Sequence, residues 1–242
     1  MRLHFLGTGD AFGNGGRMQT CFWLEGDTES ILIDCGATAL TALKSADVEP
    51  NEISTVALTH LHGDHFGGVP FLVLDGQFRR RERPLTIVGP PGTRERVEAA
   101  MELLFPGSLA TRRRFELDFA ELDFERPTVV GLASISATPV ELPGTPACAL
   151  RIECDGRAIA YTGDTAWSDG LVGLAAGADL LVAEAYFFDR QVPFHLDYAT
   201  LRANRERLDC KRIVVTHMSP DMLDRQSESE FECAYDGLVV EL

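Results

Sequence analysis

One short segment of the chain gathers three imidazoles and a carboxylate. It reads His60-Leu61-His62-Gly63-Asp64-His65. Imidazole and carboxylate groups are ligands of borderline divalent ions such as zinc. On a helix His60 and His62 would point apart, whereas a loop relieved by Gly63 lets them converge. Because the chain has only 6 histidines, this segment indicates a metal site rather than a group of solvated loop side chains.

Other chemically active residues stand where apolar runs of the chain end. Asp164, Glu184 and His217 each follow a short run of apolar and β-branched residues, as His60 does. Ligands of α/β proteins gather beyond the ends of strands. We therefore expect these four residues to belong to one site that is assembled from distant parts of the chain.

The apolar runs predict strands that are buried on both faces. They span residues 30–33, 54–58, 85–88, 158–161, 179–183 and 212–215. We expect helices over residues 93–104, 168–176 and 198–208. The alternation of strand and helix predicts an α/β architecture with helices outside and sheet inside, in one domain of residues 1–242.

The composition is that of an ordinary globular chain, with 45% hydrophobic and 24% charged residues. No apolar run approaches the roughly 20 residues that span a bilayer, and the first residues do not resemble a signal peptide. We expect a cytoplasmic protein without a membrane partner. The six scattered cysteines form no C-x-x-C pair, so we expect reduced thiols in the core.

The net charge of −15 bears on the partners of the protein. Polyanions bind to clustered Lys and Arg side chains, whose counterion release supplies most of the affinity. The chain has two basic runs, residues 79–83 and 112–114, and we expect them to form solvated faces. The sequence disfavours a large RNA or DNA substrate and leaves a small anionic substrate open.

The chain resembles the metallo-β-lactamase superfamily, in its ribonuclease Z-like and phosphodiesterase-like branch. The resemblance implies a four-layer αββα sandwich and covers nearly the whole chain. The motifs that carry it stand in family order: Leu6-Gly7-Thr8-Gly9-Asp10, Ile33-Asp34-Cys35-Gly36, the His60–His65 loop, Tyr161-Thr162-Gly163-Asp164-Thr165, Ala183-Glu184-Ala185 with a later His195, and Thr216-His217-Met218-Ser219.

The resemblance also implies a centre of two divalent ions, zinc in the first place and manganese or iron as alternatives. A hydroxide between the ions would be the nucleophile, because a bound divalent ion lowers the pKa of water towards neutrality. Asp34 would orient the histidine loop from behind. The implied ligands are His60 and His62 for the first ion, Asp64, His65 and His217 for the second, and Asp164 for both.

One expected ligand of the first ion is missing. The family places a third histidine on the strand before the one that carries Asp164, but no histidine lies between His65 and His195. Alignment without a gap puts Glu141 at that position, and a gap of one residue puts Leu142 there. Three interpretations stay open: Glu141 is a ligand, the first ion is held weakly, or the site has lost an ion.

Glu184 and His195 match a pair that assists proton transfer to the leaving group in ribonuclease Z-like members. A carboxylate-steadied imidazole suits general acid catalysis near neutral pH. The alternative for His195 is a histidine at a helix N-terminus or in the core.

These residues predict a binuclear metal-dependent hydrolase that acts on a small phosphodiester or related anionic ester, and the family suggests a homodimer. Thioester, lactone or sulfate-ester hydrolysis is the alternative within the fold. Another is a catalytically degenerate metal-binding regulatory protein. Processing of tRNA 3′ ends is less favoured, because no long basic, glycine-rich arm lies between Asp75 and Val140.

Overall fold

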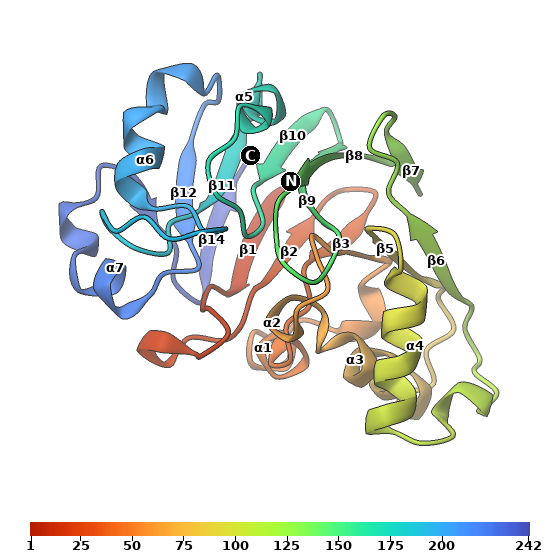
Figure 1. The fold of residues 1–242 in the computed structure, drawn as a ribbon. Coiled ribbons are helices and arrows are strands. Elements are labelled where there is room, and N and C mark those ends of the chain that lie inside the picture. Colours follow the sequence, from red (N-terminus) through yellow and green to blue (C-terminus); the bar gives the residue numbers. More distant parts are fainter.

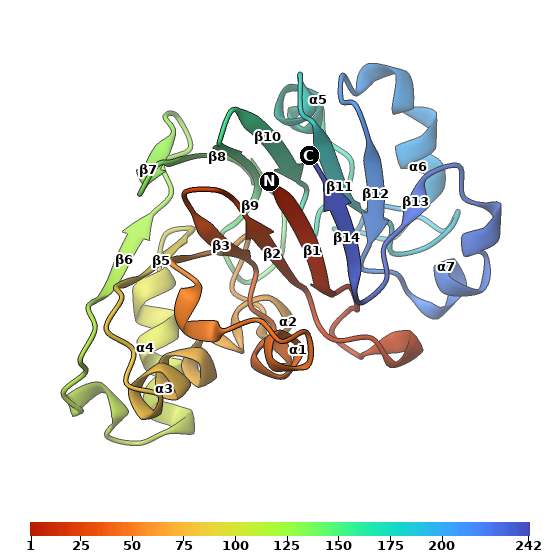
Figure 2. The ribbon, with the colours of Figure 1, turned by 180° about the vertical axis from the view of Figure 1, so that it is seen from behind.

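The computed structural model describes residues 1–242 as two seven-stranded sheets that face each other (Figures 1 and 2). The first sheet has the order β14 (Leu238–Glu241), β1 (Arg2–Gly7), β2 (Cys21–Glu25), β3 (Ser30–Ile33), β4 (Thr55–Ala57), β5 (Leu85–Gly89) and β6 (Leu117–Glu121). The second has the order β13 (Glu232–Cys233), β12 (Ile213–Thr216), β11 (Leu180–Glu184), β10 (Arg157–Tyr161), β9 (Ala147–Cys154), β8 (Ala133–Val140) and β7 (Thr128–Val130).

Helices cover the outer face of each sheet. Apolar side chains therefore pack in three places: between the two sheets, and between each sheet and its helices. Side chains from the inner faces of both sheets, Phe22 and Tyr161 among them, form the central core. The helices beside the first sheet are α1 (Ala39–Ser45), α2 (Gly63–Phe66), α3 (Val69–Phe78) and α4 (Thr93–Leu104), and those beside the second are α5 (Gly170–Ala175), α6 (Tyr198–Ala203) and α7 (Pro220–Asp224). This confirms the four-layer αββα sandwich.

The six runs predicted as buried strands are β3, β4, β5, β10, β11 and β12, which lie in the parallel parts of the two sheets. The helix expected over residues 198–208 is interrupted. It ends at Ala203, and a 3-10 turn, Arg205–Arg207, follows. At the end of the helix, the backbone amide and the side-chain amide of Asn204 both donate to the Thr200 carbonyl, at 3.3 and 3.0 Å.

Parallel strands bring their carboxyl ends to one edge of each sheet, and this places the site. β3 and β4 run parallel in the first sheet, and β10, β11 and β12 run parallel in the second. The residues that follow these strands therefore meet between the two sheets, at the edge beside α2 (Figure 1). No helix of the structure combines the length and apolarity that crossing a bilayer requires.

One residue of the basic runs is not solvated. Arg81 is 3% exposed, and its guanidinium donates to the carbonyls of Pro50, Ile53, Arg83 and Pro84. The expectation of a solvated face is therefore wrong for Arg81, which ties together the loops before β4 and β5.

Candidate metal centre

The histidine loop leaves β4 and turns into α2, and this turn separates its side chains. His60 is the third residue after β4, and His62 precedes Gly63, where the short helix begins. His60 and His65 are fully buried and their rings lie 4.1 Å apart, centroid to centroid. His62 is exposed, with its ring centroid 4.7 Å from that of His60.

Four buried residues from three separate elements converge on one point. They are Asp64, His65, Asp164 and His217, whose ligand atoms all lie within 4.8 Å of one another. His65 Nε2 is 3.3 Å from Asp164 Oδ1, and His217 Nε2 is 3.3 Å from Asp64 Oδ2. We call this group the second metal position.

The unpaired atoms of this group fit a cation. His65 Nε2 and Asp164 Oδ1 are buried and have no hydrogen-bond partner. Buried polar atoms without a partner are costly, and these two face each other across the second metal position. A divalent ion with imidazole and carboxylate ligands would satisfy both atoms.

The electrostatics of the second metal position favour ionised carboxylates. Burial would raise the pKa of Asp164, but the neighbouring His217, His65 and His60 hold it well below its ordinary value. Burial likewise would lower the pKa of His217, but Asp164, Asp64 and Glu184 raise it to about 10. Proton and metal therefore compete for the same nitrogen atoms, and metal binding would release protons.

The backbone is held in an unusual conformation where it delivers these side chains. Asp34, Gly163 and His217 have φ values of 54°, 59° and 58°, in the left-handed region that side chains other than glycine seldom adopt. The His217 amide donates to the Thr8 carbonyl, 3.2 Å away at the end of β1. Contacts between the sheets thus maintain a conformation that directs the imidazole into the centre.

Asp34 fixes the orientation of the loop, as the sequence analysis expected. Its Oδ2 lies 2.7 Å from His65 Nδ1, and its Oδ1 accepts the Thr59 amide at 2.8 Å. Burial raises the pKa of Asp34, and the bonds from His65 and Thr59 oppose that rise. A proton on His65 Nδ1 leaves Nε2 free to face the metal position.

The other half of the centre has fewer donors. His60 Nε2 is buried without a hydrogen-bond partner and lies 3.9 Å from Asp164 Oδ2. We call His60, His62 and Asp164 the first metal position. The structure does not bring Glu141 to it. Glu141 follows β8 in an exposed turn, and its side chain is exposed to solvent because the strand ends at Val140.

Glu184 and His195 form the pair that the sequence predicts. Glu184 Oε1 is 2.6 Å from His195 Nδ1, and its Oε2 accepts the amides of Thr165 and Leu196. The pair shares Asp164 with the metal centre, since the ligand atoms of these three residues also lie within 4.8 Å. Burial lowers the pKa of His195, but the bond and the charge of Glu184 raise it above the ordinary value.

The centre opens into a pocket of about 150 Å³. Sequence reasoning missed its outer wall, which Asp10, Phe12 and Tyr186 supply. Asp10 is buried and accepts the amides of Phe12 and Asn14, so that the loop presents a Phe12 side chain that is 79% exposed. The Leu6–Asp10 motif pointed to this loop, whereas no signal marked Phe12. The pocket lining is Asp10, Ala11, Phe12, His62, Asp64, Asp164, Tyr186, His195 and His217.

Comparisons with known proteins agree with this geometry. The model of one protein family, described as anti-Pycsar protein Apyc1, matches residues 1–234. Ribonuclease Z of Anoxybacillus flavithermus is 30% identical, over 90% of this chain and 87% of that protein. The crystal structure of the short form of human tRNase Z has a TM-score of 0.81 and 28% identity, and it covers 100% of this chain and 99% of the human chain. A diphosphatase of the PhnP family shares the fold, with a TM-score of 0.78 and 19% identity, over 100% of this chain and 97% of that one.

The contact of Asp34 with His65 leads to a prediction about metal affinity. An Asp34→Asn variant keeps the left-handed backbone, which asparagine tolerates, but its amide places a donor opposite His65 Nδ1. The imidazole must then carry its proton on Nε2, towards the metal position. We expect the affinity for zinc to fall by about ten- to a hundredfold, as measured by competition with a chromophoric chelator. Asp179→Asn, which neutralises a carboxylate remote from the centre, should change nothing, and an equal affinity in both variants would refute the role of Asp34.

The Glu184–His195 bond leads to a prediction about pH. A raised pKa keeps His195 protonated to higher pH, so activity that needs this proton is lost as the pH rises through the pKa. In Glu184→Gln the carboxylate charge is gone, and we expect the alkaline limb of the pH–rate profile to move to lower pH. The shift should appear with an alkyl leaving group and be absent with p-nitrophenolate, which leaves without a proton. The same shift with both leaving groups would contradict the assignment.

Proposed function

The chain belongs to the family of the anti-Pycsar protein Apyc1, within the ribonuclease Z-like branch of the metallo-β-lactamase superfamily, and we propose that it hydrolyses small phosphodiesters. It is a metal-dependent hydrolase of that fold. The observation that carries the finer proposal is the shared Asp164, which joins the metal ligands to the Glu184–His195 pair. Charge neutralisation and proton delivery thus meet at one pocket.

The groups around the pocket would have different roles in hydrolysis. Two divalent ions, zinc in the first place, would supply an activated water and neutralise charge on the phosphoryl oxygens. His195 donates a proton to the departing oxygen, and Glu184 keeps its Nδ1 engaged so that Nε2 faces the substrate. The thiolate of a thioester leaves more readily than an alkoxide and gains less from such a donor, and so the pair favours phosphodiesters over thioesters.

The dimensions and charge of the pocket favour a small substrate. The pocket has a volume of about 150 Å³, and no lysine or arginine lines it. The segment from Asp75 to Val140 folds into α3, β5, α4 and the strands β6 to β8, so that none of it forms a separate arm. The alignment with the Anoxybacillus flavithermus protein runs over 276 residues, more than this chain contains, so that relative carries insertions within the matched region.

Ribonuclease activity is the second candidate, because the relative at 30% identity bears the name ribonuclease Z. The exposed Arg112 and Arg114 could contact phosphates at a distance from the centre. A degenerate regulatory protein is less favoured, since the ligands of the second metal position and the proton donor are both retained.

Turnover of bis(p-nitrophenyl) phosphate tests the proposal. We expect hydrolysis that is lost with chelation and restored by zinc or manganese. Asp64→Ala should lower kcat/KM by about a thousandfold or more, because it removes a ligand of the second metal position. Glu141→Ala is the control and should match the wild type. If no ion restores turnover, the chain is not a phosphodiesterase, and faster cleavage of a precursor tRNA with a 3′ trailer than of the small ester would favour the ribonuclease.

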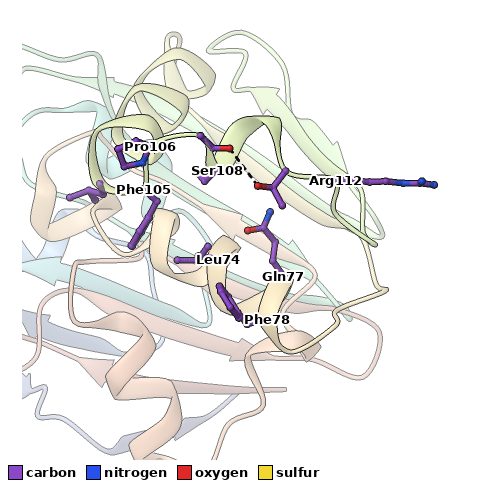
Figure 3. Close-up of a pocket in the computed structure, with 10 residues that line it drawn as sticks. Leu74, Gln77, Phe78, Phe105, Pro106, Ser108 and Arg112 are labelled. Atoms are coloured by element: carbon purple, nitrogen blue, oxygen red, sulfur yellow. Dashed lines mark hydrogen bonds between the residues drawn. The ribbon is translucent and has the colours of Figure 1, made fainter.

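We propose that the protein is a homodimer that pairs through the α3–α4 surface. Phe78 and Leu103 are each 81% exposed there, beside a hollow of about 630 Å³ that Leu74, Phe105 and Pro106 help to line (Figure 3). Exposed apolar side chains next to an apolar hollow allow a two-fold arrangement in which each copy fills the hollow of the other.

Light scattering after size exclusion tests the dimer. We expect a mass of twice the 26.5 kDa of the chain and a monomer in the variant Phe78→Asp/Leu103→Asp, because burial of two carboxylates opposes association. Val129→Asp, which alters an exposed apolar side chain on β7, should remain dimeric. A monomeric wild type would refute the proposal.

A further inference from the structure

We propose that the substrate completes the first metal position, so that the ion held by His60 and His62 binds together with the phosphoryl group. The free protein would keep one ion firmly and the other weakly. The inference uses the proposed function only for the class of ligand, a phosphate group.

The two metal positions differ in the number of donors that the chain provides. The second position has four donors, Asp64, His65, Asp164 and His217, and all four residues are buried. At the first position, His60 Nε2 lies 3.9 Å from Asp164 Oδ2. The family resemblance adds His62, whose ring centroid is 4.7 Å from that of His60, but these three residues do not converge as the four of the second position do. His62 is exposed, so solvent competes there more than at the buried residues of the second position.

The neighbouring turn supplies no further donor. Residues 141–146 connect β8 to β9 at the same end of the fold, because the Cys148 amide donates to the Thr59 carbonyl at 2.9 Å, next to His60. Glu141 is exposed, and Thr145 Oγ1 donates to the Pro146 carbonyl. The Cys148 thiol is buried and donates to the Thr59 carbonyl.

The first position is nevertheless built to receive an ion. Thr59 Oγ1 lies 3.0 Å from His60 Nδ1 and is itself held by Asp34 at 2.8 Å, so the free Nε2 of His60 is oriented towards Asp164. This argues against a site that has been lost. Three protein ligands with one open position are typical of zinc ions that bind substrate directly. A phosphoryl oxygen is anionic and suits that position.

If phosphate is a ligand of the ion at the first position, the binding of the ion and the binding of phosphate depend on each other. If phosphate raises the affinity of the first position for its ion, the ion must raise the affinity for phosphate by the same factor. A phosphate group bound beside His62 would also replace solvent there. His62 and Asp164 line the pocket of about 150 Å³ together with His195, so a small anion that enters the pocket meets both metal positions.

Metal retention and manganese titration test the inference without measuring turnover. After dialysis of the zinc-loaded protein against metal-free buffer, we expect one ion per chain by mass spectrometry. This one-ion protein is then titrated with Mn²⁺, and the free ion is followed by its electron paramagnetic resonance signal. The titration should show a weak site whose affinity for Mn²⁺ rises about tenfold with millimolar inorganic phosphate. Two ions retained without phosphate, or an affinity for Mn²⁺ that phosphate does not change, would overturn the inference.

Two variants assign the weak site to its residues. His62→Ala should remove the phosphate-dependent binding of Mn²⁺ and still retain one zinc ion, whereas Glu141→Ala should behave as the wild type. Loss of the weak site in Glu141→Ala would show that the turn supplies the ligand and would refute the inference. If the linkage to phosphate holds and no phosphodiester is hydrolysed, the proposed function fails and the inference stands.

Discussion

The structure depends on the mutual neutralisation of carboxylates and imidazoles that are buried between the two sheets. Asp34, Asp64 and Asp164 are removed from solvent together with His60, His65 and His217. An isolated buried charge is costly, and a buried pair is stable only when its hydrogen bonds are satisfied. Asp34 meets this condition through its hydrogen bonds with Thr59 and His65. His65 Nε2 and Asp164 Oδ1 have no hydrogen-bond partner and remain suited to a cation.

Asp164 relates this charge balance to chemistry. One carboxylate lies within reach of three imidazoles and of the Glu184–His195 pair. Any ion that binds changes the field at His195, and any proton on His195 changes the field at the ions. If the proposal of unequal metal affinities holds, one position is a permanent part of the protein and the other responds to what enters the pocket.

Much of this could be predicted from the sequence, and the limits have physical reasons. Buried parallel strands have continuous apolar sequences, and the polar residues that end them can therefore be assigned to the site from the sequence alone. The position of Glu141 could not be predicted, because a single residue more or less in a turn decides which side chain faces the centre. Arg81 was misjudged since a run of arginines looks the same whether it meets water or carbonyl groups. Phe12 gave no signal because an exposed side chain leaves no periodic pattern.

The order of strands in the first sheet has a consequence for folding. β1 pairs with β14, and His217 meets Asp64 across a sequence separation of 153 residues. Contacts of such large sequence separation form late and slowly in folding. Until they form, the histidine loop can meet metal ions only as an exposed and incomplete set of ligands.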